Sequence, residues 1–235
     1  MIKTATIAIS SIVILLLVSA AATHLFGFYF DRRDFSGGKS QVYGVSFRPE
    51  YPSKEFGLDP KETALAIFNE LGVSHARLII TWKDIEKREG EFDFSFFDWF
   101  IGEAEKKNIK LIINIGERVA GWPEYHVPDW AKGLSAEERQ PKTLAMIKTA
   151  VNRYKNSPAV EMWQVENEPL FYWAKLKEIE QTYMVKTQIS PEFLKREVDL
   201  VRSLDGRPVI ITDSGELSDW KQASLAGDYF GTTLY

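Results

Sequence analysis

The feature that most constrains the fold is a regular alternation, from Val42 onward, between short apolar runs and longer amphipathic segments. Short apolar runs bounded by turn residues are typical of buried strands, and apolar residues spaced three and four apart are typical of helices. Strands that alternate with single helices indicate a parallel sheet. The predicted strands are 42–47, 73–80, 110–115, the first half of 160–169, 208–212 and 228–235. The predicted helices are 60–71, 95–107, 142–154, 191–204 and 218–225.

Capping residues support several of these helix boundaries. Asp59 and Ser190 are predicted N-caps, and each precedes a proline, which is favoured at the first helical position. Ser95 is the predicted N-cap of the second helix, and Gly72 is a predicted C-cap of the first.

Six strands and five helices fit a (β/α)8 barrel, also called a TIM barrel, that is cut before its last two strands. A barrel that stops two units short cannot close, and its open edges would favour aggregation. We therefore expect residues 42–235 to be an incomplete barrel that belongs to a longer protein. Residues 31–41, with the run Ser36-Gly37-Gly38-Lys39-Ser40, are predicted to be a short flexible tether.

The first thirty residues include an uncharged run that ends at Phe30 and has its apolar centre at 12–18. A run of this length spans a hydrocarbon core of about 30 Å. Two interpretations remain open. Aromatic residues within 25–30 suit a membrane interface and favour an uncleaved anchor through residues 5–30, whereas Ser19-Ala20-Ala21-Ala22 would suit the cleavage site of a signal peptide. Either one predicts that the barrel is exported, as a membrane-anchored or a secreted protein.

The composition excludes several classes of function. The net charge of −4 argues against nucleic acid as a partner, because such partners require a basic surface. The chain has no cysteine, so it carries no disulfide and no thiolate chemistry. Its three histidines, His24, His75 and His126, lie far apart and lack the spacing of metal ligands.

The segment 160–169 changes character half-way along. It begins as a buried strand, and its second half is then polar up to Pro169, which has no N–H to continue a ladder. The polar residues are Gln164, Glu166, Asn167 and Glu168. Carboxylates and amides at the end of a buried strand are costly unless they face a wet, functional cavity. Catalytic residues of parallel barrels lie at such strand ends, so the pattern predicts an active site here.

The triplet Asn167-Glu168-Pro169 resembles the acid/base motif of the clan A retaining glycoside hydrolases, such as the family 5 cellulases and mannanases. The resemblance implies that Glu168 is the proton donor and that Asn167 hydrogen-bonds the sugar 2-hydroxyl. Such enzymes need a second carboxylate as nucleophile. The resemblance places it at the end of a seventh strand, which this sequence does not contain. The chain by itself is therefore expected to be inactive, and no cofactor is expected.

A second match to the clan follows the second predicted strand. Residues 82–94 resemble the W-x-x-x-E-x-x-x-G-x-(Y/F)-(D/N)-F pattern of families 10, 39 and 42, with Trp82, Glu86 and Gly90 in place. The resemblance also implies that Arg77 hydrogen-bonds the nucleophile and holds it ionised. We take Trp82 and Arg77 as candidate substrate-site residues.

A loop after the third predicted strand, residues 121–131, resembles the Pro-x-Trp loop that these families place near the cleaved sugar. Trp122 and Trp130 are candidate platforms for sugar rings, and His126 is a candidate ligand for a hydroxyl; packing within the loop is the alternative for all three. The resemblance also implies a Tyr near the nucleophile, and Tyr235 is the candidate for it. Strand three lacks the His that families 5 and 10 often have, so the family is not fixed.

Other interpretations remain open. Glu216 or Glu166 would be the local replacement for the missing nucleophile, and Glu216 is more simply a candidate substrate contact. A rival function is a membrane-tethered carbohydrate-binding pseudoenzyme. A phosphate-binding barrel is disfavoured, since that site lies after strands seven and eight. The expected partner is an oligo- or polysaccharide with β linkages, whose sugar and linkage the sequence does not define.

Overall fold

The computed structural model divides the chain into two units, residues 1–42 and residues 43–235. It describes residues 12–24, 42–122, 124–171, 189–215, 218 and 220–233. Residues 12–24 form a helix with exposed side chains, whereas the rest of the predicted anchor or signal segment and the tether lie outside the described residues. No helix in the described ranges has both the length and the apolar character needed to cross a bilayer.

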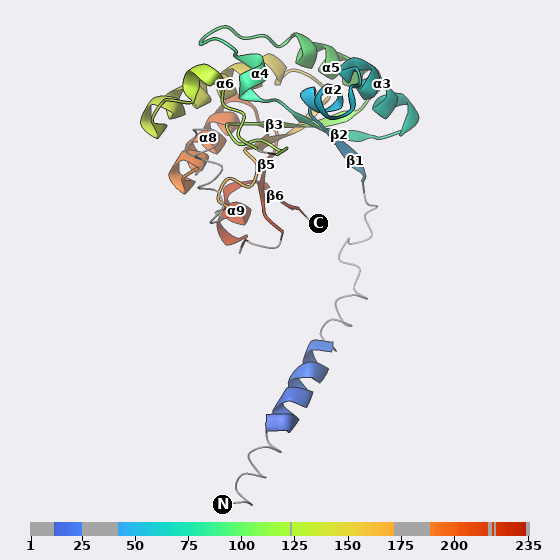
Figure 1. Cartoon of the computed structure of the whole chain (residues 1–235), viewed down its shortest axis with the longest axis vertical. Coiled ribbons are helices and arrows are strands. Elements are labelled where there is room, and N and C mark those ends of the chain that lie inside the picture. The colour runs from blue at the N-terminus through green and yellow to red at the C-terminus, as the bar shows by residue number, and fades with distance from the viewer. Residues whose placement is uncertain are drawn as a thin grey trace, which may run out of the picture. The chain divides into compact units, whose positions relative to one another are not determined.

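One sheet of six parallel strands forms the centre of the second unit, in the order β1-β2-β3-β4-β5-β6 (Figure 1). The strands are β1 (Gly44–Phe47), β2 (His75–Ile79), β3 (Lys110–Ile115), β4 (Val160–Val165), β5 (Val209–Asp213) and β6 (Tyr229–Thr232). Their order follows the chain, with helices between them, which is the architecture of a partial (β/α)8 barrel. The predicted six-stranded parallel sheet is confirmed.

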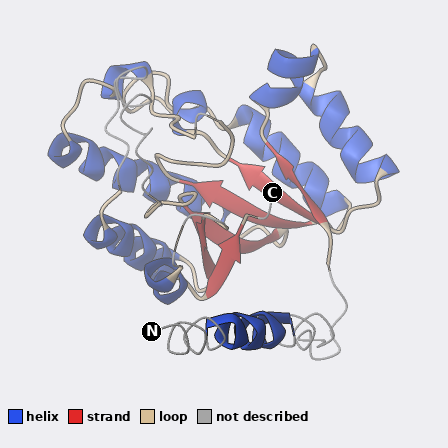
Figure 2. Cartoon of the chain, turned by 60° about the horizontal axis from the view of Figure 1, so that its bottom comes forward, coloured by secondary structure: helices blue, strands red, loops and turns tan. Residues whose placement is uncertain are grey.

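The helices lie around the outer side of the sheet, while the strands occupy the centre (Figure 2). The helical elements are α2 (Glu50–Phe56), α3 (Pro60–Glu70), α4 (Trp82–Ile85), α5 (Ser95–Lys106), the 3-10 helix η1 (Asp129–Ala131), α6 (Ala136–Tyr154), α8 (Pro191–Leu204) and α9 (Lys221–Ala226). The short elements α2, α4 and η1 were not predicted. Each is a short helix that follows a strand. The apolar spacing of so short a helix repeats too few times to be recognised in the sequence.

The predicted caps were mostly right. The carboxylate of Asp59 accepts hydrogen bonds from two backbone N–H groups at the start of α3, and the hydroxyl of Ser190 accepts one from Phe193. The prediction of Ser95 as an N-cap was wrong, because Ser95 is already the first helical residue of α5. Its N–H is satisfied by the carboxylate of Asp93 at 2.9 Å. Gly72 follows the C-cap of α3 and has a left-handed φ of 62°.

Helix α6 begins six residues earlier than predicted, at Ala136 rather than Lys142. Ser135 and Glu138 form a capping box, in which each side chain accepts a hydrogen bond from the other residue's backbone N–H. Pro141 therefore lies inside the helix, not before it.

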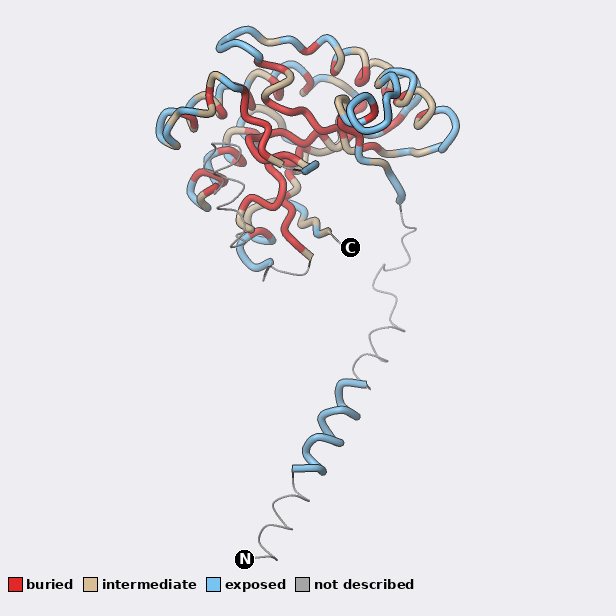
Figure 3. Tube along the Cα trace, viewed as in Figure 1, coloured by how far each residue is buried: buried red, intermediate tan, exposed pale blue. Residues whose placement is uncertain are grey.

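The inner strands β2 to β5 are the most buried part of the unit (Figure 3). The core contains fully buried side chains from β2, β3 and β4, including Leu78, Ile113 and Trp163, packed against α5, α6 and α8. Because all six strands are parallel, their carboxyl ends meet at one edge of the sheet. The polar residues that follow β3, β4, β5 and β6 are gathered at this edge.

Candidate active site

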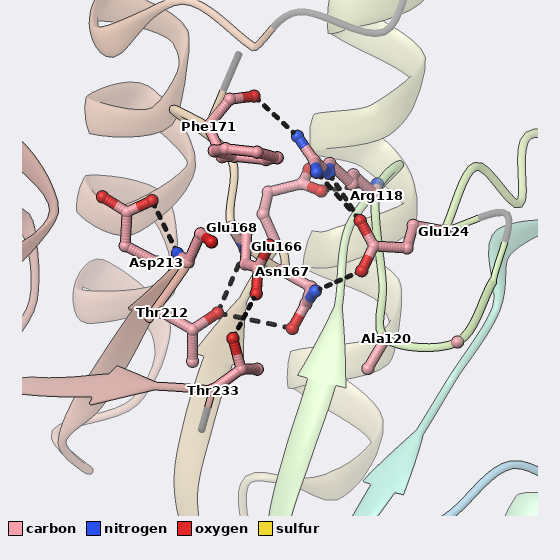
Figure 4. Close-up of polar contacts among 12 residues, drawn as sticks. Arg118, Ala120, Glu124, Glu166, Asn167, Glu168, Phe171, Thr212, Asp213 and Thr233 are labelled. Atoms are coloured by element: carbon pink, nitrogen blue, oxygen red, sulfur yellow. Dashed lines mark hydrogen bonds and ion pairs between the residues drawn. The ribbon is translucent and has the colours of Figure 1, made fainter. Parts of the chain in front are cut away.

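Glu168 lies just beyond the carboxyl end of β4 and is held from two neighbouring strands (Figure 4). Its backbone N–H donates to Thr212 Oγ1 of β5 at 3.1 Å, and its Oε1 accepts from Thr233 Oγ1, beyond β6, at 2.9 Å. Its φ of 47° is left-handed, as is the φ of 60° at Glu166. Such backbone angles are uncommon for residues other than glycine and concentrate at functional sites.

Asn167 is buried beside Glu168, and both the nitrogen and the oxygen of its side-chain amide form hydrogen bonds. Its Nδ2 donates to Glu124 Oε1 at 2.8 Å, and its Oδ1 accepts from Arg77 Nη2 at 3.2 Å. The carboxylate can only accept and the guanidinium can only donate, so this pair of contacts fixes the orientation of the amide. The structure thus brings together Asn167, Glu168 and Arg77, three of the predicted site residues.

Arg118 and Glu124 form the side of the site that comes from the loop after β3. Arg118 donates from Nε and Nη2 to Glu124 Oε2 at 3.0 and 2.9 Å, and from Nη1 to the carbonyl of Phe171 at 3.1 Å. The Arg118 side chain is only 3% exposed, so its charge is compensated inside the protein and not by water. Neither residue was predicted from the sequence.

The surroundings of Glu168 favour its protonated form. Burial is the largest influence and raises the pKa of this carboxyl above its usual value. The negative charges of Glu124 and Asp213 raise the pKa further, whereas the Thr233 hydrogen bond and the positive charge of Arg118 lower it. The net effect is a carboxyl that keeps its proton to a higher pH than an exposed glutamate.

Trp82 and Trp130 lie away from this site, in the packing around Glu86. Trp82 is fully buried and donates from Nε1 to Glu86 Oε2 at 2.6 Å. Trp130 packs edge-on against it at 5.6 Å between ring centroids and donates to the carbonyl of Glu86 at 2.9 Å. The second oxygen of Glu86 accepts the N–H of Gly90 at 2.7 Å. The tryptophan–glutamate–glycine spacing therefore builds a turn, and in this structure Trp82 has no surface to offer a sugar.

The other two candidates, Trp122 and His126, lie in the loop after β3 and differ in their exposure to solvent. The side chain of Trp122 is 68% exposed, and it lines a cavity of about 450 Å³ together with Arg48, Tyr51 and Glu55. His126 is only 1% exposed, and its Nε2 lies 3.1 Å from the carbonyl oxygen of Gly121. The same Nε2 lies 3.5 Å from Nη1 of Arg48. Burial, with a smaller effect from the positive charge of Lys83, lowers the pKa of His126 to about 4. Trp122 is thus presented to solvent, and His126 is not.

Two predicted site residues, Glu216 and Tyr235, lie outside the described residues. Within the described ranges, no group of three His, Cys, Asp or Glu side chains is arranged to hold a metal ion. The site residues that were not predicted share one property: each lies at the carboxyl end of a strand or beyond it. They are Arg118, Glu124, Thr212, Asp213 and Thr233. The nearest signal was their position at or after the ends of predicted strands.

Comparison with known proteins gives one family match. Residues 51–130 match the model of the family 42 glycoside hydrolases, described as β-galactosidase. β-Galactosidase BgaA of Clostridium cellulovorans is 24% identical over 215 residues, which cover 82% of this chain and 30% of that protein. The chain therefore spans less than a third of the length of this relative.

Solved structures agree on the fold. The β-galactosidase of Bacillus circulans sp. alkalophilus superposes with a TM-score of 0.60 at 18% identity, over 83% of this chain and 40% of that chain. Xylanase 10B of Thermotoga maritima gives a TM-score of 0.58 at 17% identity, over 82% of this chain and 60% of that chain. The resemblance to clan A glycoside hydrolases is confirmed, and the match points to family 42.

Proposed function

Because this chain is related to the family 42 β-galactosidases, we propose that it supplies the acid/base half of a retaining glycosidase, with Glu168 as the acid/base residue. The observation that carries the proposal is the position of Glu168. It lies at the carboxyl end of β4, buried, hydrogen-bonded to Thr233 and surrounded by groups whose net effect raises its pKa. A general acid must hold its proton near the working pH, and enzymes raise the pKa of glutamate by burial to achieve this.

The reaction would proceed in two steps. Glu168 would first protonate the oxygen of the leaving sugar while a second carboxylate attacks the anomeric carbon, and Glu168 would then take a proton from the attacking water. The resemblance places that second carboxylate after a seventh strand, and the described residues contain six strands. A seventh strand that would carry this nucleophile is therefore not among the described residues.

The substrate class follows from the relatives and from the surface. β-Galactosides are the first substrates to test, since the matched family is described as β-galactosidase. The exposed ring of Trp122, above a cavity lined also by Arg48 and Tyr51, would stack against a sugar ring. A cavity with an aromatic wall and a few charged groups, among them Arg48 and Glu55, suits an oligosaccharide better than a phosphate or a nucleic acid.

The test uses the complete reading frame that contains this sequence and a panel of β-linked glycans with galactosides first. Glu168→Gln should lower turnover of glycans by about 10² to 10⁴-fold, the usual contribution of general acid–base catalysis. Glu161→Gln, at the opposite end of β4 and paired with His75, is the matched control and should leave turnover unchanged. Equal turnover by Glu168→Gln and the unmodified protein would refute the assignment.

A second measurement identifies the role of Glu168 as the base of the second step. With an aryl glycoside whose leaving group needs no acid, Glu168→Ala should accumulate the glycosyl-enzyme, and azide should rescue it, because this anion attacks without needing a base. The product would be a glycosyl azide with retained configuration. Binding of glycans without turnover, in the complete protein, would favour the carbohydrate-binding pseudoenzyme instead.

A further inference from the structure

Glu166 is a buried carboxylate behind the candidate acid that the proposed mechanism does not use. It lies two residues before Glu168, is fully buried, and joins the end of β4 to the loop after β3. Its Oε1 accepts the backbone N–H of Glu117 at 2.9 Å and its Oε2 accepts that of Arg118 at 2.6 Å. Its own N–H donates to the carbonyl of Ile115 at 2.8 Å.

The loop is wrapped closely around this carboxylate. Gly116 has a φ of 143°, and a Cβ atom built on it would lie 2.3 Å from the carboxyl carbon of Glu166. Only glycine allows such an approach. The close contact between the loop and Glu166 therefore depends on glycine at position 116.

The same loop carries the charges that act on Glu168. Arg118 and Glu124 belong to it, Glu124 accepts from Asn167 at 2.8 Å, and the backbone N–H of Asn167 donates to the carbonyl of Arg118 at 2.6 Å. Figure 4 shows Arg118, Glu124 and Asn167 on one side of Glu168. Thr212 and Thr233 lie on its other side. Release of the loop from Glu166 would move Arg118 and Glu124 relative to Glu168.

A second buried carboxyl meets Glu166 from α8. Glu197 is fully buried, and no N–H or O–H of another described residue reaches either of its oxygens. The carboxyl of Glu166 lies close enough to it for the two groups to share a proton through a hydrogen bond. Two carboxyls can form such a bond only if one of them carries a proton. Glu166 accepts two backbone N–H groups that stabilise its charge, so the proton belongs on Glu197.

Other charged groups near the pair come from three elements. Glu117 adds a negative charge from the loop, but it is paired with Arg139 of α6 at 2.7 Å and accepts from Thr143. Arg196, next to Glu197 on α8, donates to Gln140 at 3.0 Å. Burial is the largest influence on both members of the pair and raises the pKa of Glu166 to about 7 and that of Glu197 well above its usual value.

We propose that Glu166 is a positioning residue, which holds the loop after β3 and thereby Arg118 and Glu124 around Glu168, and that protonated Glu197 is its hydrogen-bond donor. The inference rests on the proposed function only in naming Glu168 as the acid. Loss of the shared proton at alkaline pH would leave two negative charges in contact in a dry site, which repel each other. The loop would then separate from the end of β4.

The test measures hydrogen exchange at the amides of Glu117 and Arg118 in the complete protein, after correction for the intrinsic pH dependence of exchange. In the unmodified protein, protection of these amides should fall at least about tenfold as pH rises through the titration of the pair, since tenfold corresponds to one pKa unit. Glu197→Gln, whose amide donates at every pH, should keep them protected throughout. Glu166→Gln, which offers only one acceptor oxygen to two N–H groups, should expose one of them at every pH.

Two further measurements keep the outcome unambiguous. Infrared spectra of the unmodified protein below the titration should show a buried protonated carboxyl, and Glu197→Gln should remove that band. Glu192→Gln, on the exposed first turn of α8, is the matched control and should change neither signal. A protection that does not depend on pH in the unmodified protein would overturn the proposal without any variant. Because neither readout needs turnover, an inactive protein that passes both tests would count against the proposed function alone.

Discussion

Asn167 Nδ2 lies 2.8 Å from Glu124 Oε1, so the amide next to the candidate acid is already engaged by a carboxylate of the protein. The clan resemblance assigns this amide to the sugar 2-hydroxyl. A hydroxyl that binds there would compete with Glu124 or share its position, since Asn167 Oδ1 is also occupied by Arg77. Glu124 therefore contacts Asn167 and also acts on the charge of Glu168, so under the proposed function it would link sugar binding to the acid.

Glu124→Gln should shift the alkaline limb of the pH–activity profile to lower pH. The substitution keeps an acceptor for Asn167 but removes a negative charge that, after burial, is the next cause of the raised pKa of Glu168. It also leaves the positive charge of Arg118 uncompensated, which lowers the pKa further. Since Glu168 must be protonated for the first step, activity at alkaline pH falls by about tenfold for each pKa unit. The measurement is kcat/KM against pH.

The same variant should lose about 1–3 kcal/mol of stability, because Arg118 keeps its charge in a buried position without its carboxylate partner. Glu91→Gln, an exposed glutamate paired with Arg88, is the control and should change neither quantity. An alkaline limb that stays in place or moves to higher pH would refute the electrostatic role of Glu124.

Thr233→Val should act in the opposite direction. The hydroxyl of Thr233 donates to Glu168 Oε1 at 2.9 Å and lowers the pKa of that carboxyl, because it stabilises the charged form. Valine has the same shape without the hydroxyl, so the pKa of Glu168 should rise and the alkaline limb should move to higher pH. Thr232→Val, at an exposed position of β6, is the matched control. Identical profiles for both variants would show that the hydrogen bond does not reach the acid in solution.

The fold was predictable to the extent that periodicity and capping residues encode it. The six strands and α8, with Ser190 as its cap, follow from apolar spacing and capping chemistry. The start of α6 was missed because Pro141 resembles a boundary, whereas the capping box at Ser135 and Glu138 starts the helix before it.

The candidate site was predictable only where it lies on strands. Asn167 and Glu168 lie just beyond the end of β4, and Arg77 lies on β2, so their shared position follows from the parallel sheet. Glu124 reaches the site through a loop in which it has a φ of 69°, and no apolar spacing encodes such a turn. For Trp82, a buried hydrogen bond to Glu86 explains the spacing of the motif without a ligand, and its place in a sugar site stays a prediction.

Glu86→Gln should therefore destabilise the protein more than it changes sugar binding. Both carboxylate oxygens of Glu86 accept strong hydrogen bonds, one from Trp82 and one from Gly90. The amide of glutamine can replace only one of them and turns an N–H group toward the other donor. A buried unsatisfied donor costs about 1–3 kcal/mol, which thermal or denaturant unfolding will measure. Glu89→Gln, an exposed carboxylate paired with Lys142, is the control. An unchanged unfolding midpoint for Glu86→Gln would contradict this role of the motif.

His126 should make the protein sensitive to mild acid. Burial first, and then the positive charge of Lys83, lowers its pKa in the folded protein to about 4 from an ordinary value of 6.5. As the pH falls through this interval, the unfolded chain takes up a proton that the folded protein does not, so stability is present above pH 6.5 and is lost toward pH 4. The expected loss is about 3 kcal/mol for this residue.

His126→Gln should remove this loss, because a glutamine amide does not titrate and can donate to the carbonyl of Gly121, which lies 3.1 Å from the imidazole Nε2. The free energy of unfolding, measured from about pH 7 to about pH 4.5, should be flatter in the variant than in the unmodified protein. Comparison at each pH cancels the contributions of carboxylates that both proteins share. His24→Gln, an exposed histidine outside the barrel unit, is the control and should leave the curve unchanged. Parallel curves for the unmodified protein and His126→Gln would mean that the buried imidazole becomes charged without cost, and that the loop opens to water at that position.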